Sequence, residues 1–377
     1  MHKIYFDNAA TTPMDSEVLQ AMLPYMENHF GNPSSIHSFG RTTRSAIEEA
    51  RKSIATCLNV SPGEIFFTSG GTEADNMAIR CSVHDFKIKH AITSHIEHHA
   101  VLHTLEELDK RGVIQLHFVR VDNEGNVDLT HLEELLKFTN ERTLVSLMHA
   151  NNEIGTLLPL KEVGEICLRY NALFHCDTVQ TMAHYAFDLQ QINVHFVIGA
   201  AHKFHGPKGV GFIYIKNDAR ITPYITGGSQ ERNMRGGTEN LYGIIGIAKA
   251  LEIANAHLTA HQQSIQELKN YFITQLQANF TDVQFNGNVT PAQSLYTVLN
   301  VSFAPNPNGE MLLFSLDIAG IAASGGSACT SGSNQGSHVL RGINADAMRP
   351  SVRFSFSKFN TTQEIDYTIT KLKEILG

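Results

Sequence analysis

Short apolar runs alternate with segments of helical periodicity through most of this chain. The runs that indicate strands are residues 64–68, 90–93, 114–120, 144–149, 172–176, 194–198 and 210–215. The helical segments between them are residues 71–83, 100–110, 130–138 and 161–170. Several runs are apolar on both faces, which is typical of strands covered by helices on each side. The alternation therefore predicts an α/β fold built on a mostly parallel sheet.

The pattern changes after about residue 240. A long helical pattern covers residues 240–279, and we expect it to bridge two domains. Strands at 296–303 and 353–357 and helices at 310–318 and 362–376 follow, which is typical of a smaller α+β unit. A chain of 377 residues has room for both. We expect a large domain over residues 15–260 and a small domain made of residues 1–14 and 261–377.

Composition excludes several classes of protein. Apolar residues make up 42% of the chain and charged residues 18%, so the chain can bury a core. The formal net charge of −8 argues against a partner that is a nucleic acid. No apolar run is long enough to span a bilayer, and the first residues do not resemble a secretory signal. The five cysteines form no C-x-x-C pair, which favours the reducing cytoplasm.

A glycine turn at residues 67–76 is the first candidate for chemistry. Gly71 and Thr72 stand where an apolar run ends and a helical pattern begins. Backbone N–H groups at a helix N-terminus, with a hydroxyl group beside them, can hold a phosphate. An ordinary turn between a strand and a helix explains the same residues.

Lys203 and Asp177 each follow an apolar run, 26 positions apart. Both would then project from the carboxyl ends of parallel strands, where such sheets bind ligands. A partly desolvated lysine amine can form a Schiff base, and a carboxylate there can pair with a pyridinium nitrogen. The alternatives are a surface lysine for Lys203 and a helix cap for Asp177, which also has Gln180 three residues on.

Two residues near the C-terminus are candidates for a nucleophile and an anion site. Cys329 stands among small and polar residues at 324–333, a setting that suits a reactive thiol rather than a core cysteine. Arg353 stands in an apolar strand, where a carboxylate could bind it through two hydrogen bonds. An incidental loop cysteine and a structural ion pair are the alternatives.

Histidines cluster at positions 95, 98, 99 and 103. If the segment is helical, His95, His99 and His103 share one face, which could bind a transition metal. No carboxylate or cysteine partner with metal-ligand spacing accompanies them, so we expect no metal. His98 falls on a different face and is a candidate for a separate catalytic role.

Taken together, the motifs resemble the cysteine desulfurases of the NifS/IscS type. These are pyridoxal-phosphate enzymes of the class-V aminotransferase family, with fold type I. The resemblance runs nearly end to end and is carried by residues 5–13, 31–35, 69–76, 97–100, 151–155, 177–180, 202–209, 235–240 and 327–333. It implies a large domain with a mostly parallel, mixed seven-stranded sheet between helices. It also implies a smaller α+β domain that carries the loop of Cys329.

The resemblance also implies a role for each candidate residue. Lys203 would hold the cofactor and move the α-proton, and Cys329 would take sulfur from L-cysteine as a persulfide, leaving L-alanine. A sulfur-acceptor protein would then receive it, for iron–sulfur cluster assembly or tRNA thiolation. A homodimer is implied as well, because one residue would reach the cofactor phosphate of the other subunit. The remaining implied contacts are Asp177 with the pyridine nitrogen, Gln180 with the phenolic oxygen, His98 with the ring and a proton, Gly71, Thr72 and His202 with the phosphate, Thr238 with the phosphate of the other subunit, Asn152 with cofactor and substrate, and Arg353 with the substrate carboxylate.

Three departures from the family pattern stand out. Ala200 replaces a usual serine, which removes one hydroxyl contact to the phosphate. Residues 334–337 differ from the usual sequence after the cysteine loop, and the chain stops soon after its last helix, where relatives that dock an iron–sulfur scaffold are longer. The alternative function is a selenocysteine lyase or another reaction on the same fold.

Overall fold

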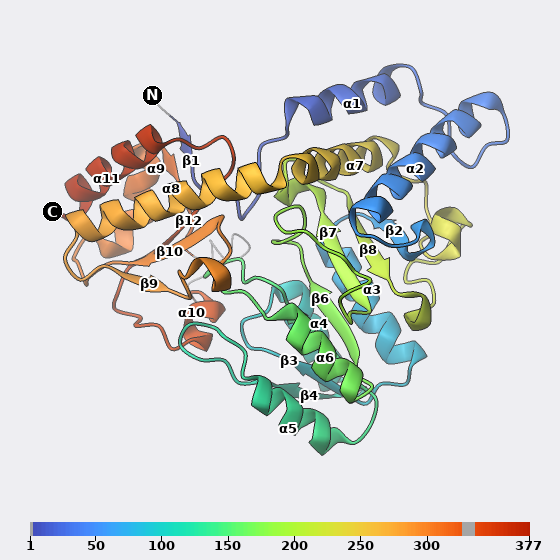
Figure 1. Ribbon diagram of the computed structural model, residues 1–377, viewed down its shortest axis with the longest axis horizontal. Coiled ribbons are helices and arrows are strands. Elements are labelled where there is room, and N and C mark those ends of the chain that lie inside the picture. The colour runs from blue at the N-terminus through green and yellow to red at the C-terminus, as the bar shows by residue number, and fades with distance from the viewer. Residues whose placement is uncertain (1–2, 326–335) are drawn as a thin grey trace.

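The computed structural model describes residues 3–325 and 336–377 (Figure 1). The strands are β1 (Ile4–Tyr5), β2 (Ile65–Thr68), β3 (His90–Thr93), β4 (Gln115–Phe118), β5 (Thr143–Met148), β6 (Leu173–Asp177), β7 (Phe196–Ala200), β8 (Gly211–Ile215), β9 (Gln284–Asn286), β10 (Val298–Ser302), β11 (Ile321–Ala322) and β12 (Ser351–Ser355). The helices are α1 (Ser16–Glu27), α2 (Ser38–Cys57), α3 (Gly71–Asp85), α4 (His99–Lys110), α5 (Leu129–Thr139), α6 (Leu160–Arg169), α7 (Leu241–Ala256), α8 (Leu258–Asn279), α9 (Leu312–Ile318), α10 (His338–Gly342) and α11 (Thr362–Leu376). None of the helices in these two ranges is long and apolar enough to cross a membrane.

The larger sheet has seven strands in the order β2-β8-β7-β6-β5-β3-β4. The five strands from β7 to β4 pair in parallel, whereas β8 is antiparallel to both of its neighbours. The predicted mostly parallel, mixed seven-stranded sheet is therefore confirmed. Strands β5 and β6 are buried along their whole length, as their apolar runs predicted.

Helices cover both faces of this sheet because apolar residues point to both sides of each strand. Neighbouring residues show this: Val145 belongs to a core cluster with α1, α2, α5, α6 and α7, whereas Leu144 belongs to a second cluster with α3 and α4. In Figure 1, α3 and α4 lie on the opposite side of the sheet from α7. The sheet is therefore a central layer between helices. Because its faces are covered, a site can form only at the ends of its strands.

A smaller antiparallel sheet, in the order β12-β10-β9, lies beside α8 and α11 (Figure 1). Its core cluster includes Phe272, Leu299, Phe354 and Leu372, together with Phe6 from the N-terminal segment. Strand β1 pairs in parallel with β11, so the N-terminus joins this unit. This separate core supports the proposal of a small domain made of residues 1–14 and 261–377.

The expected single helix over residues 240–279 is wrong, because the chain forms two helices there. α7 ends at Ala256, α8 begins at Leu258, and His257 between them has a non-helical backbone with φ −116° and ψ 14°. α7 packs against α1 and α2, whereas α8 packs against α11. The two helices are therefore oriented by different neighbours. Neither a glycine nor a proline marks the break between them in the sequence.

Lys269 on α8 is 1% exposed and donates hydrogen bonds from Nζ to Ser294 Oγ (2.7 Å) and Leu295 O (3.0 Å). Burial lowers the pKa of this amine from 10.5 to about 7. Between these two values the unfolded chain binds more protons than the folded chain, so stability rises with pH in this window. Below about pH 7 both states carry the proton, and the cost of the buried charge is complete.

We expect Lys269→Met to remove this dependence. The free energy of unfolding of the original chain, minus that of the variant, should rise between pH 7 and 10 by about 1.4 kcal/mol per unit. Urea unfolding of both proteins across this range measures the difference. Lys249→Met, which removes a surface ion pair with Glu252, is the control and should show no such slope. A flat difference for Lys269→Met would mean that the buried amine keeps its proton.

Candidate active site

Nine of the predicted site residues line one cavity of about 220 Å³ at the carboxyl ends of β5, β6 and β7. Sequence distances of up to about 280 residues separate them, so only the fold brings them together. The predicted residues that line it are Gly71, Thr72, His98, Asn152, Asp177, Gln180, His202, Lys203 and Arg353. Ala9, Ala10, Asp75, Met148, Val179 and Ala200 complete the wall.

Lys203 ends a single 3-10 turn, Ala201–Lys203, which directly follows β7. Its Nζ donates hydrogen bonds to the carbonyl oxygens of Ala9 (2.6 Å) and Ala10 (2.9 Å). The N-terminal segment thus forms the opposite wall and holds the amine inside the cavity. Lys203 is not the surface lysine that the sequence left open, since it is only partly exposed and is held by these two carbonyl groups.

Asp177 is the last residue of β6 and is buried. The backbone N–H of Val179 donates to Asp177 Oδ1 (2.9 Å), and no helix follows for the carboxylate to cap. Gln180 lies beside it and donates from Nε2 to Ala9 O (3.0 Å). A buried carboxylate with one N–H donor is well placed to pair with a protonated ring nitrogen.

The N-terminus of α3 opens into the same cavity. Its N-cap residue, Gly70, provides no side-chain hydrogen bond, so the first N–H groups are left for a ligand. A Cβ atom on Gly71 would lie 2.9 Å from Val179 Cγ2, so this close approach requires glycine. Burial, followed by the charges of Lys203 and Lys208, lowers the pKa of His202 to about 4, which leaves a neutral imidazole.

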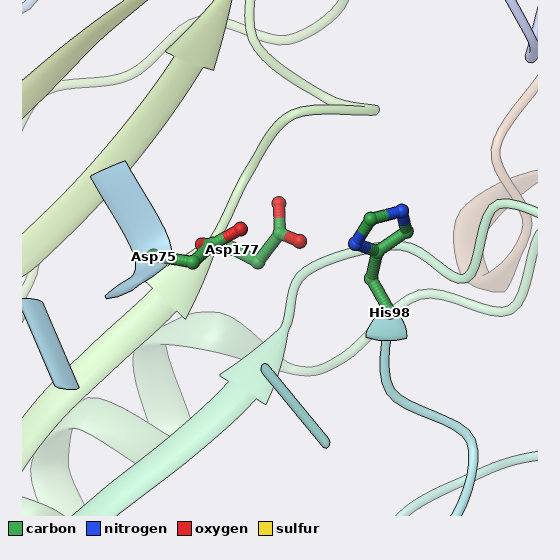
Figure 2. A group of neighbouring side chains, drawn as sticks. All are labelled: Asp75, His98 and Asp177. Carbon is green, nitrogen blue, oxygen red and sulfur yellow. The ribbon is translucent and has the colours of Figure 1, made fainter. Parts of the chain in front are cut away.

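His98 is the N-cap residue of α4, and its Nδ1 accepts a hydrogen bond from the backbone N–H of Ala100 (3.1 Å). That bond places any proton of the neutral ring on Nε2. Burial is the largest influence on His98 and lowers its pKa, and the neighbouring charge of Lys203 acts in the same direction, whereas Asp177 opposes them. Figure 2 shows His98 converging with Asp177 and Asp75 from three different elements.

Two buried carboxyl groups near Asp177 have no predicted role. One oxygen or nitrogen from each of Asp75, His98 and Asp177 lies within 4.8 Å of the others (Figure 2). Burial, then the charges of Asp177 and Glu97, raises the pKa of Asp75 well above its ordinary value, and burial raises the pKa of Glu97 to about 8. Asp75 stands one helical turn after Gly71, and that spacing is the signal that could have found it.

Arg353 lies in the cavity wall and is 1% exposed. Its Nη1 donates to Asn152 O (3.0 Å), and its Nη2 donates to Asp7 Oδ1 (2.7 Å). Its Nε has no hydrogen-bond partner among residues 3–325 and 336–377. The sequence left open whether Arg353 binds a ligand anion or forms a structural ion pair. It forms an ion pair with Asp7, and its five N–H groups are enough to bind an anion as well.

Two predicted residues do not line this cavity. Thr238 lies in a separate cavity with Ser69, Arg235 and Glu239, and Cys329 lies outside the described residues. His95, His99 and His103 would share one helix face only if the whole segment were helical, and it is not, because α4 begins at His99. His95 stacks on Phe118 instead, and His99 stacks on His103 and packs at a tilt against His338.

The donors fit pyridoxal phosphate. The uncapped N-terminus of α3 and the approach at Gly71 suit the phosphate, and the amine and carboxylate suit the aldehyde and the ring nitrogen. Ala200 ends β7 beside this cradle without a hydroxyl group. The phosphate would therefore depend more strongly on the backbone N–H groups, Thr72 and His202.

Comparisons with known proteins agree with this chemistry. Residues 4–368 match the family model described as aminotransferase class-V. The cysteine desulfurase IscS of Dictyoglomus turgidum is 44% identical, over 99% of this chain and 94% of that protein. The putative cysteine desulfurase IscS 1 of Bacillus subtilis is 42% identical, over 97% and 96%. A solved NifS-like protein has a TM-score of 0.91 at 38% identity, covering 100% and 99% of the two chains. SspA, solved in complex with cysteine, has a TM-score of 0.80 at 30% identity, covering 96% and 100%.

Proposed function

Because this chain belongs to the aminotransferase class-V family and is a pyridoxal-phosphate-dependent cysteine desulfurase, we propose that the cavity around Lys203 is where it takes sulfur from L-cysteine. The meeting of a lysine amine, a buried carboxylate and a buried arginine in one cavity is the observation that supports this placement. The family relationship suggests the reaction, and the cavity supplies the residues for it.

The residues around the cavity divide into those for the cofactor and those for the substrate. Pyridoxal phosphate, when bound, stabilises negative charge on the α-carbon of an amino acid. Asp177 would keep the ring nitrogen protonated, and Gln180 would donate a hydrogen bond to the phenolic oxygen. Thr72, His202 and the first N–H groups of α3 would hold the phosphate. Arg353 and Asn152 would orient the substrate through its carboxylate.

We assign proton transfer to Lys203 and His98. The Lys203 amine would hold the cofactor at rest and, once released by the substrate, remove the α-proton and return it during the reaction. His98, neutral and with its Nδ1 occupied by Ala100 N–H, would present Nε2 to the reacting atoms.

Sulfur transfer requires a nucleophile, and we assign it to Cys329. Its thiolate would attack the sulfur of L-cysteine, which forms the S–S bond and breaks the Cβ–S bond. The electron pair of that bond stays on the carbon, which gains a proton, so L-alanine leaves and Cys329 holds a persulfide. A sulfur-acceptor protein, serving iron–sulfur cluster assembly or tRNA thiolation, would then receive that sulfur.

A homodimer is proposed because Thr238 lies away from the cavity that it would serve. A second copy could bring the Thr238 face to its neighbour's phosphate site. Large apolar side chains on and beside α1 and at the start of α2 are exposed and are suited to an interface: Leu19, Met26, Phe30, Ile36 and Phe39. We place the protein in the cytoplasm, whose reducing conditions suit the buried thiols of Cys81, Cys167 and Cys176.

The proposal is tested by measuring sulfide and L-alanine release from L-cysteine, with the visible spectrum of the purified protein. We expect a yellow protein that forms the two products in equal amounts in the presence of a thiol reductant. L-selenocysteine is the parallel substrate, since strong preference for it would favour a selenocysteine lyase. Products in unequal amounts, or a keto acid in place of L-alanine, would contradict the desulfurase assignment.

A further inference from the structure

Asp7 connects the arginine of the cavity to the N-terminal segment. It follows β1 and forms an isolated parallel bridge with Ser355 of β12. Its Oδ1 accepts two hydrogen bonds, from Arg353 Nη2 (2.7 Å) and from Ser324 Oγ (2.8 Å). The Asp7 side chain is 19% exposed, whereas that of Arg353 is 1% exposed. A carboxylate that does not line the cavity thus forms an ion pair with a guanidinium group in its wall.

The guanidinium group is held on two sides. Asn152 O and Asp7 Oδ1 each accept one N–H, from Nη1 and Nη2. Arginine has five N–H groups, so three remain, among them the buried Nε–H that has no partner within the described ranges. A carboxylate binds an arginine best through two parallel hydrogen bonds. The contacts with Asp7 and Asn152 therefore fix the position of the guanidinium group and leave N–H groups with which it can bind a carboxylate.

The negative charge of Asp7 weakens the binding of a carboxylate to Arg353, whereas the orientation that Asp7 gives to Arg353 favours it. An amino-acid carboxylate that binds Arg353 becomes the second negative group on one guanidinium. Two carboxylates near each other in a poorly solvated site repel, and the interaction is much stronger there than in water. The hydrogen bond from Arg353 to Asp7 therefore favours carboxylate binding by orientation, and the Asp7 charge weakens it.

We propose that Asp7 is a positioning residue that sets the affinity of the site for amino-acid carboxylates, by orienting Arg353 and by opposing a second negative charge. This inference rests on the proposed role of Arg353 in holding the substrate carboxylate. The affinity that results is moderate, which allows the amino-acid product to leave after each reaction. Asp7 itself does not touch the reacting atoms.

Asp7→Asn and Asp7→Ala separate the two effects. The probe is L-alanine, added to the holoenzyme with Cys329→Ser, and the measurement is the change in visible absorbance of the bound cofactor. Asp7→Asn keeps an oxygen acceptor for Arg353 and removes the charge, so the Kd for L-alanine should fall about fivefold. Asp7→Ala also removes the acceptor, and its Kd should be at least about fivefold above that of Asp7→Asn. Equal Kd values for Asp7→Asn and the parent, or for the two variants, would overturn the proposal.

Ethylamine, which is L-alanine without its carboxylate, is the matched ligand, and its Kd should not differ among these proteins. Ser324→Ala removes the other hydrogen bond to Asp7, and its Kd for L-alanine should stay within twofold of the parent. A larger change in this Kd would mean that the Ser324 hydroxyl group sets the affinity through its hydrogen bond to Asp7, which contradicts the proposal. If Asp7→Ala folds poorly, the rise in melting temperature with saturating L-alanine still compares Asp7→Asn with the parent.

Arg353→Met separates the inference from the function on which it rests. A strong loss of L-alanine binding in Arg353→Met, with no change in either Asp7 variant, would overturn only the inference. Unchanged L-alanine binding in Arg353→Met would overturn the proposed carboxylate site, and the inference with it.

Discussion

Replacing Lys203 with alanine should reduce desulfuration of L-cysteine on the order of 10⁴-fold or more. The variant loses the group that would hold the cofactor covalently and the base that would remove the α-proton. No other described lysine lines the cavity, so no neighbour can replace the amine. The rate of L-alanine formation measures the loss. Borohydride reduction followed by mass spectrometry measures covalent attachment of the cofactor, which should be absent.

Lys208→Ala is the matched control for this experiment. Lys208 lies five residues further along the chain, is exposed and does not line the cavity. Its variant should keep the covalent cofactor and at least half of the activity. Covalent cofactor that persists in Lys203→Ala would contradict the assignment of Lys203 and would require another amine in the site.

Cys329→Ala should lose sulfur transfer by ~10³-fold or more while it keeps the cofactor, because it removes only the nucleophile. The residues that would hold the cofactor come from α3, β6 and the turn after β7. The visible spectrum should therefore match that of the parent. Persulfide is measured by mass spectrometry of the peptide containing residue 329 after addition of L-cysteine.

Cys57→Ala is the control for Cys329→Ala. Cys57 is a partly buried free cysteine at the end of α2, away from the cavity, and burial raises its pKa. Its variant should keep full activity and form the same persulfide. Equal activity in Cys329→Ala and the parent would remove Cys329 from the mechanism and would favour a lyase that needs no protein thiol.

The positions of three candidates after the ends of strands were predictable from the sequence. Asp177 and Lys203 follow apolar runs, and the glycine turn before Thr72 follows another. In a parallel α/β sheet these positions share one edge, because each strand runs in the same direction. The structure places these residues around one cavity.

Other features required the folded chain. The order of the strands could not be read from the sequence, because β8 inserts between β2 and β7 and runs antiparallel to both. The break at His257 follows from the different partners of α7 and α8. The condition for a shared histidine face is not met, because α4 begins at His99 and leaves His95 outside the helix. The strand order and the break at His257 both depend on long-range packing.

By itself, the sequence determined the class of fold and the candidates for the residues that carry chemistry. Local periodicity and turn residues define where strands and helices form, and the motifs propose the Lys203 amine, the Asp177 carboxylate and the Cys329 thiol. Only the tertiary structure decided which of these groups interact. Asp7 and Arg353 are 346 residues apart and form one partly buried ion pair, and Asp75 and Glu97 lie near Asp177. The physical reason is that a charge's environment depends on burial and on neighbours brought by folding, which no short segment contains.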